Sequence, residues 1–321
     1  MSCFEMRPMR AGEEEALLNL LEGAFGVRGI FQRYMDWDPL LRPEDTLLAL
    51  DDQGPISCVQ IFSRRIRLRG ETVALGGIGS VATADAYRER GLASELMRHA
   101  IREMEQRGMA LALLFTGLFD FYQRLGFRSV PQARRLLHRP HPPAEPALEL
   151  SVRPFQQADL EAISALYESY SAAFEICTVR DASYWQGQLG YAGSPDEDFR
   201  LVERAGRVVA YARCIELEGA RVAMEFARSE SAAAELAALL LALTPEERPL
   251  VCPQAPDPEL DQALAGTGAR LETVADPTLF WRVLDRPSLA RLAQLPSADD
   301  EELLVALVGG SRALYWPSDR F

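Results

Sequence analysis

The segment of residues 81–127 constrains the fold most, because it sets a strand, a basic glycine turn, a helix and a second strand in immediate succession. The first strand ends at Thr83, and a helical pattern of apolar residues begins at Leu92 and runs to Met104. This order predicts an α/β (α+β) domain with a mixed central sheet flanked by helices.

The turn between the strand and the helix has the features of an anion site. Amide groups at a helix N-terminus have no partner inside the helix, and the helix dipole favours negative charge there. Gly91 allows phosphates to approach the backbone closely, and Arg88 and Arg90 add positive charge. We therefore expect the turn to bind the phosphates of a ligand.

Here the sequence resembles the GCN5-related N-acetyltransferases (GNAT), whose acyl-CoA pyrophosphate loop has Arg or Gln, two residues, Gly, one residue, and Gly or Ala. Arg88, Gly91 and Ala93 fill the three defined positions. The resemblance implies acetyl-CoA as cofactor, bound by the loop residues Arg88, Glu89, Arg90, Gly91, Leu92 and Ala93. It also implies that the two strands separate, so that Val81, Ala82 and Thr83 hold the pantetheine arm.

A dinucleotide-binding loop is the competing interpretation, because residues 77–82 fit the pattern G-x-G-x-x-A. That pattern should join a strand directly to a helix, and the segment about 20 residues later should be a strand that ends in an acid. Apolar residues instead continue after Gly79, and the later segment is helical. The sequence therefore disfavours this interpretation.

Length and composition point to two domains in a chain of 321 residues with 48% hydrophobic residues. The five cysteines lack metal-ligand spacing, and we expect no metal site and no disulfide framework. No run of 18 apolar residues and no signal peptide is evident, so we expect a soluble, cytoplasmic protein without a membrane partner. The net charge of −13 argues against nucleic acid and suits a cationic partner, although solubility explains it equally well.

A proline-rich stretch divides the chain. Four prolines occur within residues 139–146, where they disrupt regular structure. We expect a catalytic domain at 1–138, a linker at 139–147, a second domain at 148–285 and a short helical tail at 286–321.

The second domain repeats the pattern of the first. Residues 150–154 and the helix behind them match residues 4–8 and their helix, which predicts two tandem GNAT-like domains. Where the second phosphate loop is expected, residues 227–231 contain no glycine, and Glu230 would repel phosphate. We expect the second domain to be degenerate.

An intact first domain followed by a degenerate one resembles the acetyltransferases of the enhanced intracellular survival (Eis) type, which acetylate amines of small molecules, including aminoglycosides. Residues 276–285 look like that family's junction into a third, sterol-carrier-like domain. Residues 286–321 are too few for such a domain, which suggests a truncated relative. That family tends to self-associate, so a homo-oligomer is a further expectation.

The implied chemistry is attack of a neutral amine on a thioester. An alkylamine is neutral only about once in 2,500 molecules at pH 7, a cost of about 4.6 kcal/mol, so a general base is useful. The resemblance assigns Tyr122 as the acid for the departing thiolate, and a backbone N–H near Val81 suits the thioester carbonyl.

The base is harder to assign, because residues 72–83 contain no acid. In the Eis type the terminal carboxylate of a phenylalanine takes the proton, and this chain also ends in a phenylalanine, Phe321. We expect the aromatic tail to dock in the first domain, where desolvation would raise the pKa of the carboxylate. Asp120 or water is the alternative base.

For the acceptor, aromatic and acidic residues cluster after the first helix, a combination that favours cations. Phe25, Asp36 and Trp37 are the candidates, in a cluster that also contains Phe31, Tyr34 and Asp38. The aromatic residues suit core packing equally well.

Three functions remain open: an acetyl-CoA-dependent N-acetyltransferase of small-molecule primary amines, a tandem enzyme like mycothiol synthase, and a non-catalytic acyl-CoA-binding sensor or scaffold. The first fits the intact loop in the first domain best. An aminoglycoside-like molecule or a polyamine is the expected acceptor class.

Overall fold

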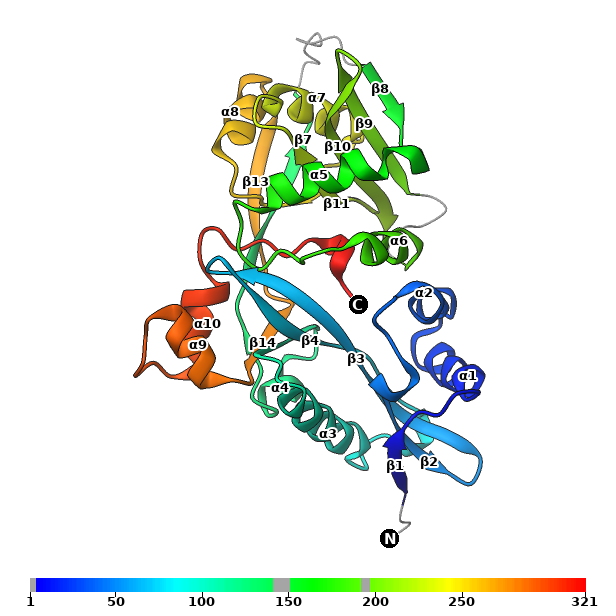
Figure 1. Ribbon diagram of the computed structural model, residues 1–321. Coiled ribbons are helices and arrows are strands. Elements are labelled where there is room, and N and C mark those ends of the chain that lie inside the picture. The colour runs from blue at the N-terminus through cyan, green and yellow to red at the C-terminus, as the bar shows by residue number, and fades with distance from the viewer. Residues whose placement is uncertain (1–3, 141–150, 192–196) are drawn as a thin grey trace.

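Two seven-stranded mixed sheets flanked by helices form the protein, which confirms the predicted tandem α/β fold (Figure 1). The computed structural model describes residues 4–140, 151–191 and 197–321. Most of the predicted linker, residues 141–147, lies outside the described residues.

The first sheet has the order β1-β2-β3-β4-β5-β14-β6. Its strands are β1 (Glu5–Pro8), β2 (Thr46–Asp51), β3 (Gly54–Leu68), β4 (Glu71–Thr83), β5 (Leu111–Phe115), β14 (Leu279–Val283) and β6 (Arg128–Ser129). The flanking helices are α1 (Glu14–Phe25), α2 (Gly29–Trp37), α3 (Leu92–Gln106) and α4 (Phe119–Gln123). Side chains alternate between the faces of a strand, so Leu47 packs in the core beside α3 while Leu48 packs in the core beside α1.

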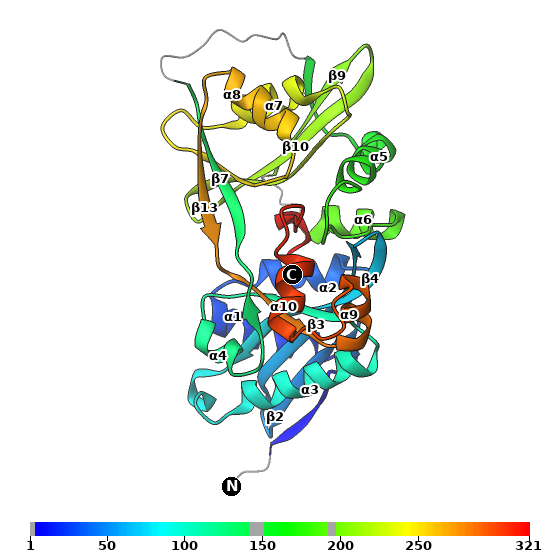
Figure 2. The same cartoon turned by 90° about the vertical axis from the view of Figure 1, so that its left-hand side faces the viewer.

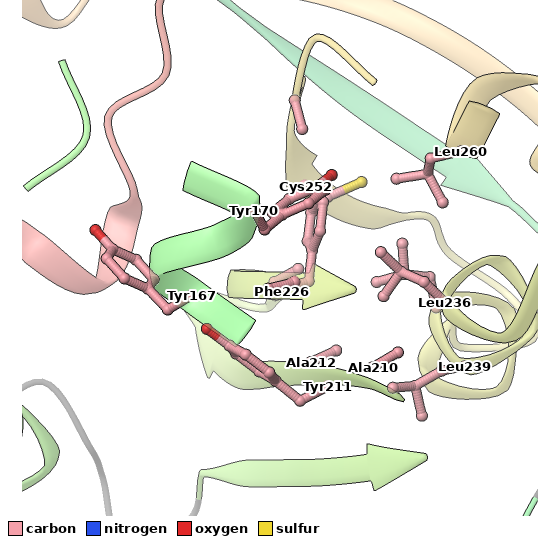
Figure 3. Packing of buried hydrophobic residues seen from close by; sticks show 14 of the residues in the cluster. Tyr167, Tyr170, Ala210, Tyr211, Ala212, Phe226, Leu236, Leu239, Cys252 and Leu260 are labelled. Atoms are coloured by element: carbon pink, nitrogen blue, oxygen red, sulfur yellow. The ribbon is translucent and has the colours of Figure 1, made fainter. Parts of the chain in front are cut away.

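The second sheet has the order β13-β7-β12-β11-β10-β9-β8. Its strands are β13 (Arg270–Asp276), β7 (Gln132–His138), β12 (Leu250–Pro253), β11 (Ala220–Arg228), β10 (Arg207–Leu217), β9 (Asp198–Arg204) and β8 (Ser151–Pro154). The helices are α5 (Leu160–Ser171), α6 (Ala182–Tyr191), α7 (Ala233–Leu243) and α8 (Pro258–Gly266). Figure 3 shows the core between this sheet and its helices, which contains Tyr167 and Tyr170 of α5, Phe226 of β11 and Leu236 of α7.

The two domains exchange a strand. β7 follows the first sheet along the chain but pairs with β12 and β13 of the second sheet, and β14 returns to pair with β5 and β6 of the first. Trp281 of β14 is fully buried opposite Leu113. The predicted boundaries at residues 138 and 285 do not separate the two sheets, because β7 lies before residue 138 but belongs to the second sheet, and β14 lies before residue 285 but belongs to the first. The domains therefore cannot part without the loss of two strands from their ladders.

The last residues run between the two domains (Figures 1 and 2). Helices α9 (Arg286–Ala293) and α10 (Asp300–Val308) pack on the first sheet beside Trp281. The residues after α10 then form hydrogen bonds with the segment between α5 and α6, where the Leu314 N–H donates to the Glu175 carbonyl at 2.9 Å. Trp316 is fully buried in the second core, ahead of the short η4 turn (Pro317–Asp319). Among the described residues, no helix is long and apolar enough to cross a membrane.

Candidate functional site

Strands β4 and β5 separate partway along their length. Their parallel ladder consists of three residue pairs and ends at Gly77 opposite Leu113. Just beyond, β4 has an irregularity against β3, where Ser80 adopts a positive φ of 51°. Peptide groups of residues 78–83 therefore have no partner on β5, and such groups suit an extended ligand. The predicted pantetheine residues Val81, Ala82 and Thr83 lie on this stretch.

The predicted phosphate loop leads into α3. Gly91 precedes the helix at a φ of 80°, a conformation that favours glycine, and no side chain caps the first turn. Arg88 pairs with Asp85 at 2.8 Å and Arg90 lies over the Tyr87 ring, yet both arginines remain exposed. The uncapped amides open α3, and the two exposed arginines belong to the turn immediately before it.

Tyr122 belongs to the core that α3 forms with the sheet. Its side chain is 7% exposed, and burial raises the pKa of the phenol to about 12. Its ring meets Phe121 edge-on at 4.9 Å. Within the part of the chain that the structure describes, no hydrogen bond to its hydroxyl is found. The phenol is thus a neutral donor at ordinary pH.

Phe321 lies against β4 on the face that carries α2. A Cβ added at Gly77 would lie 2.3 Å from the Phe321 ring, and one at Gly79 would lie 3.2 Å from its carboxyl carbon. The ring stacks on Phe62 at 5.3 Å and meets Phe115 at 5.5 Å. Only glycines on β4 allow this close approach. No salt bridge to the terminal carboxylate is found among residues 4–140, 151–191 and 197–321.

Neighbouring residues of β4 point to opposite faces of the sheet, which places the two candidate catalytic residues, Tyr122 and Phe321, on different faces. The side-chain positions of Gly76 and Ile78 point to the α3 core, which contains Tyr122, whereas those of Gly77 and Gly79 point to Phe321. Tyr122 and Phe321 therefore lie on opposite faces of the first sheet, beside the stretch where β4 and β5 are apart.

Arg320 fixes the backbone next to the terminus. Its guanidinium group donates to Asp276 at 3.0 Å and lies 4.4 Å above the Phe115 ring. The Arg320 carbonyl accepts a hydrogen bond from the Tyr34 hydroxyl at 3.3 Å. Tyr34, placed in the predicted acceptor cluster, thus contacts the tail.

A buried ion pair lies beneath Phe321, and the sequence analysis did not find it. Arg64 and Asp38 pair at 2.6 Å with both side chains fully buried. The guanidinium group also lies within 6 Å of four aromatic rings, those of Phe62, Tyr184, Tyr191 and Phe321. The one available signal was that Arg64 shares a strand face with the apolar Ile66 and Leu68, in a strand that also contains Arg65 and Arg67.

The predicted acceptor residues are spread over the outer side of α1 and α2. Phe25 is 48% exposed, and Asp36 accepts a hydrogen bond from Gln32 at 2.8 Å. Trp37 packs on Gly190 of α6, where an added Cβ would lie 2.4 Å from the indole. The three residues are not gathered around Phe321, and their role stays a prediction. Asp120, the alternative base, is exposed on α4.

The corresponding region of the second domain is filled by the protein itself. Arg228, the last residue of β11, pairs with Asp257 at 2.7 Å. Beside β11, Trp316 packs on Phe226 with ring centroids 5.1 Å apart, and Ser318 donates to Glu225 at 2.6 Å. Among the described residues, no group of three or more His, Cys, Asp or Glu could hold a metal ion.

Part of the chain is similar in sequence to a known protein family. Residues 5–130 match the family model described as an acetyltransferase (GNAT) domain. No curated protein matches the chain.

Three solved structures share the fold at low identity. A probable N-acyltransferase from Enterococcus faecalis has a TM-score of 0.71 at 16% identity, covering 88% of this chain and 73% of its own. A GCN5-related N-acetyltransferase from Anabaena variabilis has a TM-score of 0.67 at 15% identity, and the match covers 89% of this chain and 74% of that protein. Eis1 from Mycobacterium abscessus has a TM-score of 0.63 at 16% identity, and the match covers 90% of this chain and 76% of that protein. The similarity extends over both domains and concerns the fold.

Proposed function

We propose that this chain, whose residues 5–130 match a GNAT acetyltransferase domain, transfers an acetyl group from acetyl-CoA to a primary amine of a small molecule. The amine attacks the thioester directly in a ternary complex. One observation carries the proposal: β4 and β5 separate beside an uncapped helix N-terminus, with Tyr122 on one face and the terminal carboxylate on the other.

Cofactor binding follows from the unpaired backbone. The amides that open α3, with Arg88 and Arg90, bind the pyrophosphate, because an uncapped helix N-terminus favours anions. The unpaired stretch of β4 then holds the pantetheine arm, and an N–H near Val81 polarises the thioester carbonyl.

Phe321 supplies the base. Its carboxylate lies beside Gly79 and has no salt bridge within the described residues, so it is available to accept the proton of the amine. The neutral form of an alkylamine costs about 4.6 kcal/mol at pH 7, so a carboxylate that receives the proton beside the bound amine is useful. Asp120 suits the role less well, because its side chain is exposed to solvent.

Tyr122 supplies a hydrogen bond to the leaving thiolate. Burial raises its pKa to about 12, above the value of about 8.5 that is usual for a thiol. Complete proton transfer to the thiolate would be uphill, so we assign Tyr122 to stabilise its charge while the proton stays on the phenol. This refines the sequence-based role of proton donor.

The position of Phe321 favours a short acyl group. The ring fills the space over Gly77 and is held by Phe62 and Phe115. An acyl chain that passes between the strands from the Tyr122 face meets this ring, which supports acetyl-CoA over longer acyl donors. Phe25, Asp36 and Trp37 remain our proposed acceptor contacts, with an aminoglycoside-like molecule or a polyamine as acceptor.

A thiol-release assay tests the function. Purified protein is mixed with acetyl-CoA and a panel of aminoglycosides, polyamines and lysine peptides, and products are identified by mass spectrometry. We expect amine-dependent thiol release together with an acetylated small molecule, at a higher rate than with octanoyl-CoA. Tight CoA binding without transfer to any amine would contradict the proposal and favour a sensor.

A further inference from the structure

A cluster of buried charges in the second domain holds the end of the tail. Arg180, in the segment between α5 and α6, pairs with Glu225 of β11 and with Asp319 of η4. Its Nη2 lies 2.9 Å from Asp319 Oδ2, and its Nε donates to Asp319 Oδ1 at 3.1 Å. All three side chains are fully buried.

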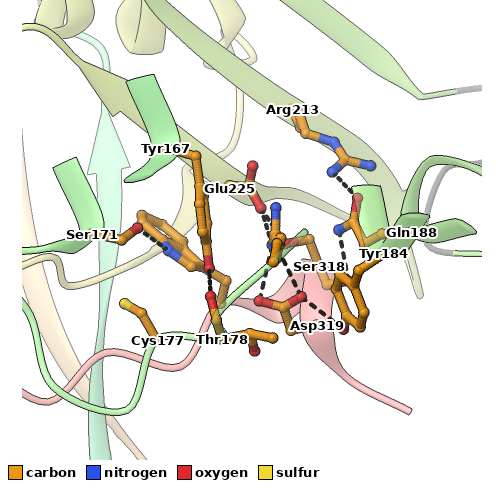
Figure 4. A network of polar contacts seen from close by, with 12 residues as sticks. Tyr167, Ser171, Cys177, Thr178, Tyr184, Gln188, Arg213, Glu225, Ser318 and Asp319 are labelled. Carbon is orange, nitrogen blue, oxygen red and sulfur yellow. Dashed lines mark hydrogen bonds and ion pairs between the residues drawn. The ribbon is translucent and has the colours of Figure 1, made fainter. Parts of the chain in front are cut away.

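Further hydrogen bonds hold the same two tail residues (Figure 4). The Gln188 side chain donates to the Ser318 carbonyl at 3.0 Å, and the Tyr184 hydroxyl donates to Asp319 at 3.2 Å. The Ser318 hydroxyl donates to Glu225 at 2.6 Å. Ser318 and Asp319 are thus fixed from several elements of the second domain.

The charges are linked to a second arginine. Arg213 of β10 donates to the Gln188 amide oxygen at 2.6 Å and pairs with Glu197. Its positive charge, with that of Arg180, lowers the pKa of Glu225 against the opposing effect of burial. Glu225 is therefore charged beside Arg180.

Buried ion pairs are a weak source of stability, because desolvation offsets much of the attraction between the charges. The tail has a separate apolar anchor, since Tyr315 and Trp316 are buried in the two domain cores. What the ion cluster adds is one fixed position for Asp319. Two residues span at most about 7 Å, so Asp319 restricts where the carboxylate of Phe321 can lie.

We propose that Asp319, held by Arg180 and by the Tyr184 hydroxyl, is a positioning residue for the terminal carboxylate. The inference rests on the proposed function, because it gives the degenerate second domain the task of holding the base of the first. It explains why β11 carries a buried glutamate whose partners are Arg180, Tyr211 and the tail rather than a ligand.

The test compares Asp319→Asn with the wild type and with Asp159→Asn. The control also removes a carboxylate from an arginine pair of the second domain, Arg153–Asp159, which is distant from the tail in the chain. Because small displacements of a reacting group can cost about 100-fold, we expect Asp319→Asn to lower kcat by about 10- to 100-fold, with the KM for acetyl-CoA unchanged. The control should retain kcat.

A second measurement does not depend on activity. Carboxypeptidase should release Phe321 faster from Asp319→Asn than from the wild type or the control, at a temperature where melting curves show all three folded. Ser318→Ala keeps every charge but removes the hydroxyl bonds to Glu225 and Arg180, and it should give a smaller change in the same direction.

Unchanged kcat and unchanged Phe321 release in Asp319→Asn would overturn the inference. So would an equal loss of kcat in Asp159→Asn, which would indicate a general loss of stability. If the wild type transfers no acetyl group, the proposed function fails, and Phe321 release alone then decides whether Asp319 holds the tail.

Discussion

Addition of one glycine after Phe321 is expected to lower kcat at pH 7 by about 100-fold or more, the range for a lost general base. The extension leaves the Phe321 ring against Gly77 and Phe62 but moves the carboxylate one residue onward, by about 3.5 Å. The amine then lacks a base beside the β4 irregularity. Initial rates of thiol release at saturating amine and acetyl-CoA measure the effect.

Two comparisons make this result specific. Phe321→Leu keeps the terminal carboxylate in place and should retain much more activity than the extended chain. CoA binding, followed by calorimetry, should be equal in all three proteins, because the phosphate loop is not changed. Full activity of the extended chain would remove Phe321 from the mechanism and leave water or Asp120 as the base.

The Tyr122→Phe substitution is expected to lower kcat by about 100-fold, the cost typical for loss of one hydrogen bond to a developing charge. Phenylalanine keeps the ring packing with Phe121 and Phe127, so the fold and the KM for acetyl-CoA should change little. Because burial raises the pKa of Tyr122 to about 12, the neutral donor persists as pH rises. Ionisation of Tyr122 should therefore cause no decline of the wild-type kcat near pH 10.

The matched control is Tyr167→Phe, which removes a buried hydroxyl of the second domain that donates to the Thr178 carbonyl at 2.7 Å. It should affect thermal stability but leave kcat near the wild-type value. A decline of wild-type kcat near pH 10 that Tyr122→Phe abolishes would contradict a fully protonated phenol. Wild-type kcat in Tyr122→Phe would exclude its role in thiolate departure.

Local sequence pattern was enough to predict the elements that position the site. The order of strand, glycine turn and helix in residues 81–106 follows from apolar periodicity and from Gly91. The repeat at 150–154 likewise identified the second sheet. The strand exchange was beyond this reasoning, because β7 and β14 have ordinary strand patterns, and no local feature states with which sheet a strand pairs.

The buried ion pairs were missed for a related reason. Arg64 pairs with Asp38, and Arg180 joins Glu225 to Asp319, so each contact connects segments that are distant in the chain. Arg64 is one of three arginines in β3, and Arg180 lies outside any helix or strand, so no local pattern identifies the partner of either residue. Trp37 is a further contact between distant segments, since it packs on Gly190 of α6, while its role in the acceptor site stays a prediction.

The most direct measurement is a crystal structure of the full chain with CoA. We predict that the pyrophosphate lies at the N-terminus of α3, that the pantetheine arm lies between β4 and β5, and that the thiol sulfur lies within hydrogen-bonding distance of the Tyr122 hydroxyl. The Phe321 carboxylate should lie across the same opening. A CoA molecule bound elsewhere, or a sulfur remote from both Tyr122 and Phe321, would contradict the account.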